Sequence, residues 1–228
     1  MRKIPDKWLG EEIKGSLEKV LSEPQSQVAR PINPVNAPNL DGYIYIPSTG
    51  LYVAKERTHF NKNWSQAHQL LESENSFMLN MYEFVEFLKH LKENPNQENN
   101  SIYESITAVR SPYRGEWIDA KFDSNGNVRY EAKHKTQEKG ILTTVEPLQK
   151  YLAQNKTPGI SLDEWINNHT QQGLPKPKIK NGDLWYWAPI NDYVAGFGAD
   201  SDVAGLICDG NPGSTDAGLG VRAAKIKV

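Results

Sequence analysis

The side chains of this chain that could carry out chemistry are few, and their spacing favours no catalytic or metal site. The five histidines, at positions 59, 68, 90, 134 and 169, lack the short spacings typical of metal ligands. We expect them on the surface or on helix faces. Cys208 is the only cysteine, which excludes an internal disulfide and a multi-cysteine zinc site. A single free cysteine is commonly a small buried hydrophobic side chain rather than a nucleophile.

The carboxylates and the known catalytic motifs lead to the same prediction. Asp163 and Glu164 lie at a predicted helix start, where capping explains them. Asp200 and Asp202 could offer oxygens to calcium, but that ion takes about six to eight oxygen ligands at defined spacing, and no EF-hand pattern occurs. The nucleophile elbow, the phosphate loop and the dinucleotide fingerprint are also missing. We therefore predict no catalytic residue, no metal and no cofactor.

The composition changes abruptly near residue 181. From there to residue 221 the sequence has no Lys, Arg or Glu, and glycine is dense. The acidic residues of this segment are Asp183, Asp192, Asp200, Asp202, Asp209 and Asp216. Small residues alternate with apolar ones over residues 194 to 199, which is typical of a short strand with one buried face.

Two interpretations of this segment are open. In the structural interpretation, a glycine-rich segment packs tightly inside the domain, and its aspartates cap turns. In the functional interpretation, the segment forms a concave or flat face. Its short side chains then stand on a fixed backbone and can be exchanged without refolding.

Three motifs in the segment resemble a known family. They are Trp185-Tyr186-Trp187, Asn211-Pro212 and Leu219-Gly220-Val221-Arg222. Together they resemble the ending of C-type-lectin-fold domains, and most of all the variable proteins of diversity-generating retroelements, whose closing motif is Gly-(Val/Phe)-Arg. Residues similar to the first half of that family are Thr58, Trp64, Ala67 and the helix at 83 to 88. The resemblance covers residues 42 to 92 and 183 to 226.

The resemblance implies an α+β, C-type lectin-like fold with short helices and small antiparallel sheets. The domain would span residues 42–228, with an insertion at about 93–182 and a variable region at about 185–222. It would follow an N-terminal helix and a proline-rich linker in residues 1–41. The positions implied as scaffold are Trp185, Trp187, Leu219, Gly220, Val221 and Arg222. The positions implied as the exposed ligand-binding face are Tyr186, Asn191, Asp192, Tyr193, Gly198, Asp200, Ser201, Asp202, Asp209, Ser214 and Asp216.

In that family, adenine-directed mutagenesis exchanges residues at chosen positions and leaves the scaffold unchanged. The products of Asn-type codons include Asn, Asp, Ser, Gly, Tyr and Thr, and these residues crowd the segment. The resemblance thus implies a ligand-binding protein with a diversifiable face, which recognises a receptor or host surface for a virus or a cell. Tyr, Asn and Ser supply adaptable contacts of the kind that antibody loops use.

Charge and hydropathy narrow the partners further. The net charge of −2 creates no global attraction to nucleic acid or anionic lipid, and the partner that the resemblance implies is a protein or surface receptor. No stretch approaches the roughly 18 apolar residues needed to cross a bilayer, and no signal peptide is predicted. We expect synthesis in the cytoplasm, and the resemblance implies association with a virion.

Two other function classes stay open. One is an enzyme of the formylglycine-generating fold group, and the other is a structural virion subunit without a ligand. The lectin-like enzymes rely on a cysteine pair or on clustered histidine ligands for iron, and the sequence has neither. A binding protein that is not an enzyme is therefore the preferred prediction.

The elements that would position the face begin with an amphipathic helix over residues 6–22, followed by a proline-rich linker. A β-hairpin is predicted at 43–46 and 51–54, a helix capped by Ser65 comes next, and a helix over 82–91 carries an apolar stripe suited to core packing. The later elements are a polar loop at 94–101, an extended segment at 102–122, a hairpin turn at 124–127, short helices at 145–153 and 162–168, a loop at 171–182 and a closing strand at 219–223.

Overall fold

Two β-sheets and four helices make up the part of the chain that the computed structural model describes, residues 40–135 and 140–227. This mixture confirms the α+β class. The helix expected over residues 6–22 and the linker after it lie outside the described residues. No helix within the described ranges is long and apolar enough to cross a bilayer.

The smaller sheet joins the beginning of the domain to the closing segment. Its strands, in spatial order, are β1 (Tyr43–Ile46), β2 (Leu51–Ala54), β12 (Ala223–Ile226) and β3 (Phe77–Met78). The predicted hairpin is confirmed, since Ile46 pairs with Leu51 across a turn in which Gly50 has φ 71°. β12 runs antiparallel to β2, so two segments that lie far apart in the sequence are neighbours.

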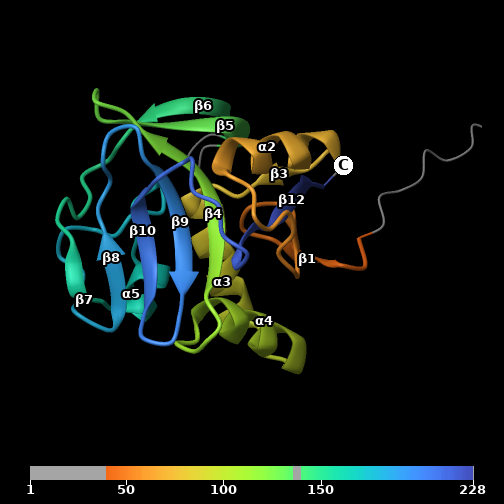
Figure 1. Cartoon of the computed structure of the whole chain (residues 1–228), viewed down its shortest axis with the longest axis horizontal. Helices are drawn as coiled ribbons and strands as arrows, with labels where there is room; N and C mark the ends of the chain where they lie inside the picture. The colour runs from red at the N-terminus through yellow and green to blue at the C-terminus, as the bar shows by residue number, and fades with distance from the viewer. Residues whose placement is uncertain (1–39, 136–139, 228) are drawn as a thin grey trace, which may run out of the picture. The chain divides into compact units, whose positions relative to one another are not determined.

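The larger sheet has eight strands (Figure 1). Its spatial order is β6 (Leu142–Pro147), β5 (Asn127–Lys135), β4 (Arg114–Phe122), β9 (Val194–Ala199), β10 (Ala204–Gly210), β8 (Leu184–Trp187) and β7 (Lys156–Ile160), with β11 (Leu219–Val221) parallel to β4 off this path. The turn between β4 and β5 is the predicted one, and Gly126 adopts φ 75° there. β4 lies within the range expected to be an insertion, yet it is a central strand that pairs with β9 and β11.

Helices α2 (Trp64–Ser73) and α3 (Met81–Glu93) match the first two predicted helices, with one correction at the start of α2. Asn63, not Ser65, caps α2. Its side chain accepts a hydrogen bond from Gln66 N, and the Gln66 side chain accepts one from Asn63 N. Asn80 and the residue three positions later form the same reciprocal box at the start of α3.

Helix α4 (Gln97–Thr107) replaces most of the polar loop expected at 94–101 and the beginning of the segment expected to be extended at 102–122, so both predictions were wrong there. Asn96 caps the helix, and only a narrow face with Ile102 and Ile106 is buried. The high polarity of this segment therefore reflects a solvent-facing helix surface rather than a loop.

Two other predictions about local structure were also incorrect. Residues 145–153 are not helical, because Val145 belongs to β6 and pairs with Arg129 of β5, and the residues after the end of β6 at Pro147 are irregular. The single closing strand is instead two strands in different sheets, which meet at Arg222. The helix expected at 162–168 is present as α5 (Leu162–Asn167).

The main core lies between the larger sheet and the helices α3, α4 and α5. Phe197 of β9 packs against Phe84 of α3 with 5.5 Å between ring centroids, and Trp165 of α5 stacks on Phe197 at 6.2 Å. The Trp165 ring nitrogen donates to Gly173 O, so its polar atom is satisfied inside the core. We call the sheet surface that meets these helices the inner face, and the opposite surface the outer face.

Candidate ligand-binding face

The order of side chains along β8 decides which residues of the Trp-Tyr-Trp motif can reach a ligand. Tyr186 is fully buried on the inner face, where its hydroxyl donates to Leu152 O at 2.8 Å. Trp185 and Trp187 are only partly buried, and their rings lie on the outer face with centroids 5.6 Å apart. The prediction that Tyr186 is exposed was therefore wrong. The strand alternates with the opposite phase, so Trp185 and Trp187, which were expected to belong to the scaffold, are the accessible pair.

Glycines form the floor on which these rings lie. A Cβ atom at Gly205 of β10 would come within 2.5 Å of the Trp187 ring, and one at Gly198 of β9 would come within 3.2 Å of Tyr113. The missing side chains allow the aromatic rings to approach the backbone. Gly198 is itself buried, so the expectation that it belongs to the exposed face was also incorrect.

The β4 side of the outer face is closed by the segment that follows β10. Trp117 is buried with Val194 and Leu219, and its ring nitrogen donates to Lys62 O at 3.0 Å. Trp64 N donates to Pro212 O, which ties the Asn-Pro turn to the start of α2. The accessible part of the outer face therefore centres on β8 and β10, where Ile207 is half-buried beside the tryptophans.

The other expected ligand-binding positions fall in three loops rather than in one cluster. Asn191, Asp192 and Tyr193 precede β9, while Asp200, Ser201 and Asp202 form the turn at its opposite end. Asp209 lies at the end of β10, near the first group, and Ser214 and Asp216 lie in the segment that returns towards β11. Asn191, Asp192, Ser201, Asp202, Ser214 and Asp216 are exposed, Tyr193 is 38% exposed, and Asp200 and Asp209 are partly buried.

Several of these aspartates stabilise turns, as the structural interpretation expected. Asp200 Oδ1 accepts from Ser201 N at 2.7 Å, and Asp216 Oδ1 accepts from Gly218 N at 2.6 Å. Asp192 has φ 69°, a left-handed conformation that Asn, Asp and Gly adopt more readily than other residues. Burial raises the pKa of Asp209. The backbone roles and the exposed side chains thus occur in the same loops.

The closing motif ends in a buried ion pair that the sequence did not reveal. Arg222 donates from Nη2 and Nε to the two carboxylate oxygens of Glu116, at 2.6 and 3.0 Å. Its Nη1 donates to Ala54 O at 2.9 Å and also to Lys55 O, and its guanidinium lies 5.2 Å from the Phe87 ring centroid. A planar fork that satisfies a carboxylate and two carbonyls is a role that Lys cannot fill. Arg222 is therefore a scaffold residue, and Glu116 is its partner on β4.

A polar cleft of about 270 Å³ opens beside the loop that precedes β9. Its lining residues are Trp64, Lys121, Phe122, Asp123, Arg129, Tyr130, Glu131 and Asp192. Arg129 is already paired with Asp123 at 2.9 Å, and the Trp64 ring nitrogen donates to Ile118 O. Much of the polar lining is thus committed to contacts within the protein.

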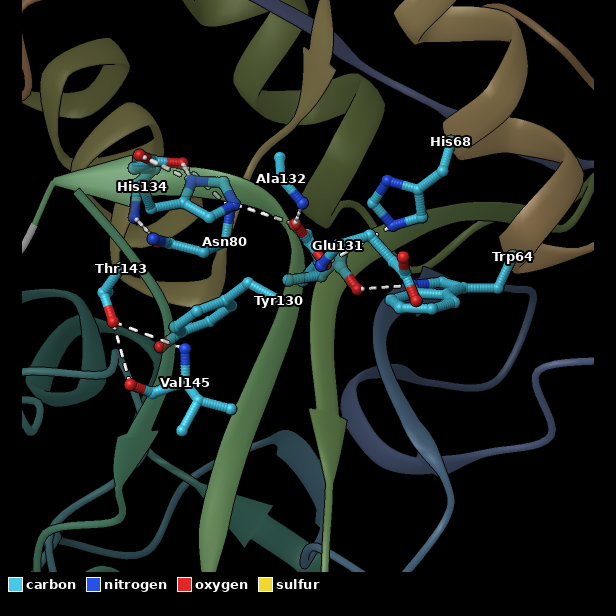
Figure 2. A network of polar contacts seen from close by, with 12 residues as sticks. Trp64, His68, Asn80, Tyr130, Glu131, Ala132, His134, Thr143 and Val145 are labelled. Carbon is cyan, nitrogen blue, oxygen red and sulfur yellow. Dashed lines mark hydrogen bonds and ion pairs between the residues drawn. The ribbon is translucent and has the colours of Figure 1, made fainter.

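A buried network of charges contacts the backbone of Glu131, one of the residues that line this cleft (Figure 2). His134 of β5 is 2.8 Å from Asp119 through Nε2 and 3.0 Å from Glu83 through Nδ1. Asp119 also accepts from Glu131 N and Ala132 N, at 3.0 and 2.9 Å. Figure 2 shows His134 at one end of the network and His68 of α2 at the other, where His68 Nε2 lies 3.4 Å from Asp119 Oδ1.

The charge state of His134 follows from its two carboxylate neighbours. Burial alone would lower the pKa of His134, but Glu83 and Asp119 outweigh it and raise this pKa to about 10. Burial likewise opposes ionisation of Asp119, yet hydrogen bonding by His134 and the approach of His68 lower its pKa to about 2. The group is an imidazolium between two carboxylates, and it fixes α2, α3, β4 and β5 to one another.

The expectation that each histidine lies on the surface or a helix face is wrong for His134, which is buried on a strand. The sequence did contain a signal for this burial, because His134 shares the even positions of β5 with Val128 and Tyr130, and these positions point inwards. The network is enclosed, and both ring nitrogens of His134 are used within it, whereas the buried Nε2 of His68 approaches Asp119 without forming a hydrogen bond. It supports the strands around the cleft rather than offering a reactive group.

Within the described residues, no group of three or more His, Cys, Asp or Glu side chains is arranged to hold a metal ion. In comparisons with known proteins, the chain matches no family model, no curated protein and no solved structure. The function is therefore inferred from the outer face and from the resemblance of the three motifs to those of retroelement variable proteins.

Proposed function

We propose that this protein binds a ligand, a receptor or another surface protein, through the outer face of its larger sheet and the loops at both ends of that face. The observation that carries the proposal is the partly exposed pair Trp185 and Trp187, held on the backbone at Gly205. Aromatic side chains of this size bury much apolar area when covered, and they are the residues most often found at the centre of protein interfaces. The proposal includes no catalytic step.

The order of elements supports a scaffold of the C-type lectin kind with a diversifiable face. The hairpin strand β2 is followed by α2, β3, α3 and α4 and then by the larger sheet, and β12 returns to pair with β2. The segment between β8 and β12 supplies both the strands of the outer face and the loops that border it. This division of one segment into buried strands and exposed loops is what the resemblance to retroelement variable proteins implies.

The loops are suited to exchange because backbone atoms make many of their contacts. Asp192 N donates to Phe122 O, Asp200 N donates to Val203 O, and Ser214 N donates to Asn211 O. A side chain can change at such positions while these hydrogen bonds persist. Tyr186 differs, since its side chain fills the core.

The test is to sequence copies of this gene from related strains, together with the neighbouring genes. We expect a reverse transcriptase gene and a near-copy of the coding segment for residues 185–222. Substitutions should gather at Asn191, Tyr193, Ser201, Asp202, Ser214 and Asp216, and spare the buried residues Leu206, Cys208 and Val221. Position 192 should hold only Asp, Asn or Gly, because of its positive φ.

Substitutions spread evenly over buried and exposed positions would contradict the proposal of a diversified face. A missing reverse transcriptase with conserved exposed positions would leave a lectin-like binding protein of fixed specificity. The two results are distinguishable from the same set of sequences.

A second candidate, a structural subunit of a larger assembly, is favoured by β6. This strand lies at the end of the larger sheet, and Leu142 and Val145 on it are 53% and 42% exposed, as is Ile141 just before it at 56%. An apolar edge strand can pair with another chain. Light scattering on the purified protein tests this candidate: a concentration-independent monomer would exclude assembly through β6, and a Val145→Lys variant that breaks an oligomer would support it.

A further inference from the structure

We infer that the partner of the outer face presents Lys or Arg side chains to it, so that a cation lies against the Trp185 and Trp187 rings. The inference rests on the proposed binding function and adds the chemistry of the partner. The observations behind it are the aromatic pair, the charges at both ends of the strands, and the way the protein uses its own cations.

The first observation is that neither tryptophan has a cation over its ring among the residues that the structure describes. Four rings in the described part of the chain do have one: Arg57 lies over Phe60, Arg222 over Phe87, Lys225 over Tyr43 and Lys227 over Tyr45. Within residues 40–135 and 140–227, no Lys or Arg lies over Trp185 or Trp187. Indole is the aromatic ring that attracts cations most strongly. The accessible rings of the outer face are therefore the strongest cation acceptors still available.

The second observation is that aspartates stand at both ends of β8, β9 and β10, while the cations Arg114 and Lys121 lie on the neighbouring strand β4, opposite Ala199 and Val194. Asp200 and Asp202 lie in the turn before β10, next to the end of β8 that begins with Leu184 and Trp185. Asp183, exposed and two positions before Trp185, belongs to the same end. Asp192 and Asp209 lie at the opposite end. The tryptophan pair is thus placed between carboxylates along the strand direction.

In the part of the chain that the structure describes, these carboxylates have no ion-pair partner, although Arg114 attracts Asp200 electrostatically. Among the described residues, none of the aspartates between positions 183 and 216 forms an ion pair with Lys, Arg or His. The arginines at the nearby edge are occupied otherwise: Arg57 donates to Gly115 O and Gly218 O, and Arg114 donates to Ser105 O and Pro112 O. Carboxylates without ion-pair partners on both sides of a partly exposed aromatic pair favour a cationic partner and disfavour an anionic one.

The experiment uses the full chain and three synthetic peptides with blocked ends that differ only in the alternating residue: Arg-Ser repeated four times, and the same peptide with Gln or with Glu in place of Arg. Binding is followed by the indole N–H signals in NMR and by titration. We expect the Arg peptide to bind, the Glu peptide not to bind, and the affinity to fall as salt is raised. The shifted signals should be those of Trp185 and Trp187.

Variants separate this site from general attraction between opposite charges. Trp187→Leu should lower the affinity for the Arg peptide about two- to fivefold, and Asp202→Asn should lower this affinity by a smaller factor. The matched control is Glu72→Gln, which removes an exposed carboxylate from α2 instead and should change nothing. Unfolding curves establish that Trp187→Leu is folded, and Trp187→Phe, which keeps a ring but accepts a cation less strongly, should fall between Leu and wild type.

Equal binding of the Gln and Arg peptides, with shifts at the tryptophans, would overturn the cationic partner while leaving the face as a binding site. Arg binding that Glu72→Gln weakens as much as Asp202→Asn does would also overturn it, since attraction would then be unspecific. The proposed function fails on a different result, the even spread of natural substitutions over buried and exposed positions. The two failures are therefore separable.

Discussion

Tyr186 and its two tryptophan neighbours are adjacent in sequence, yet they lie in different environments. The Tyr186 hydroxyl is satisfied by Leu152 O inside the core, which makes this tyrosine a structural residue. Its neighbours face outwards on the same strand. At the scale of single residues, the alternation along β8, and not the residue type, decides which side chains point to the outer face.

This difference predicts opposite tolerance at two tyrosines. Tyr186→Ser removes a buried ring and should destabilise the protein by about 3–5 kcal/mol, whereas Tyr186→Phe should cost about 1 kcal/mol through the lost hydrogen bond. Tyr193→Ser, at a 38% exposed loop position, should change stability by less than about 0.5 kcal/mol. Urea unfolding measures all three. Equal losses for the two Ser variants would mean that Tyr193 is part of the core.

The buried imidazolium predicts how stability depends on pH. Since the pKa of His134 is raised from 6.5 to about 10, its stabilisation is complete below pH 6.5 and declines as pH rises towards 10. Since the pKa of Asp119 is lowered from 3.8 to about 2, its stabilisation is complete above pH 3.8 and declines towards pH 2. For these two groups, the free energy of unfolding should be greatest between about pH 4 and 6.5.

Unfolding curves at a series of pH values check this. His134→Gln should lower stability at pH 6 by several kcal/mol, about 3–5, because Glu83 and Asp119 are left as buried carboxylates without a cation. Between pH 6.5 and 10, the free energy of unfolding of this variant should decline less steeply than that of the wild-type protein. His90→Gln, at a partly exposed position, serves as the control. A wild-type curve that is flat up to pH 10 would contradict a charged His134.

At the scale of elements, the outer face depends on close contact between rings and strand backbone. Gly205 is the tightest such contact on β10, because a Cβ there would meet the Trp187 ring at 2.5 Å. The orientation of the tryptophan pair is thus a property of two neighbouring strands rather than of either alone.

Gly205→Ala should therefore move the Trp187 ring and destabilise the protein by about 1–3 kcal/mol. Near-ultraviolet circular dichroism and the Trp187 indole signal report the movement. Gly42→Ala is the matched control, since nothing lies within 4 Å of a Cβ at that position, and it should leave both readouts unchanged. An unchanged indole signal in Gly205→Ala would show that the ring is not held by this contact.

Sequence patterns predicted the elements that carry a local signal. The hairpin around Gly50, the apolar stripe of α3 and the Asn-Gly turn each depend on neighbouring residues, and all were confirmed. Helix α4 was missed because its buried face is narrow, and β6 because it is stabilised by pairing with β5. The charge network was missed because Glu83, Asp119 and His134 meet only through tertiary structure. Pairings between distant residues are not visible in a single sequence.

At the scale of the whole described domain, Arg222 connects the two sheets. It pairs with Glu116 of the larger sheet and donates to Ala54 O of the smaller one, and it lies where β11 gives way to β12. Breaking such a pair by removing one partner leaves a buried charge uncompensated.

Glu116→Ala should accordingly cost about 3–5 kcal/mol, because both Arg222 and Arg57 lose a carboxylate. Glu98→Ala removes the partner of Lys55 in an exposed pair and should cost less than about 1 kcal/mol. Urea unfolding of both variants measures the difference. If the two losses are alike, the Arg222 pair does not hold the sheets together.

The position of β12 has a consequence for how the protein is made. The smaller sheet cannot be completed, and Arg222 cannot reach Glu116, until residues 222 to 226 have left the ribosome. A copy whose coding segment acquires a stop codon anywhere in the region proposed to vary would lack this strand and remain open to proteolysis. Only chains translated to the end of the segment proposed to vary would then fold stably, so truncated copies would be removed by proteolysis.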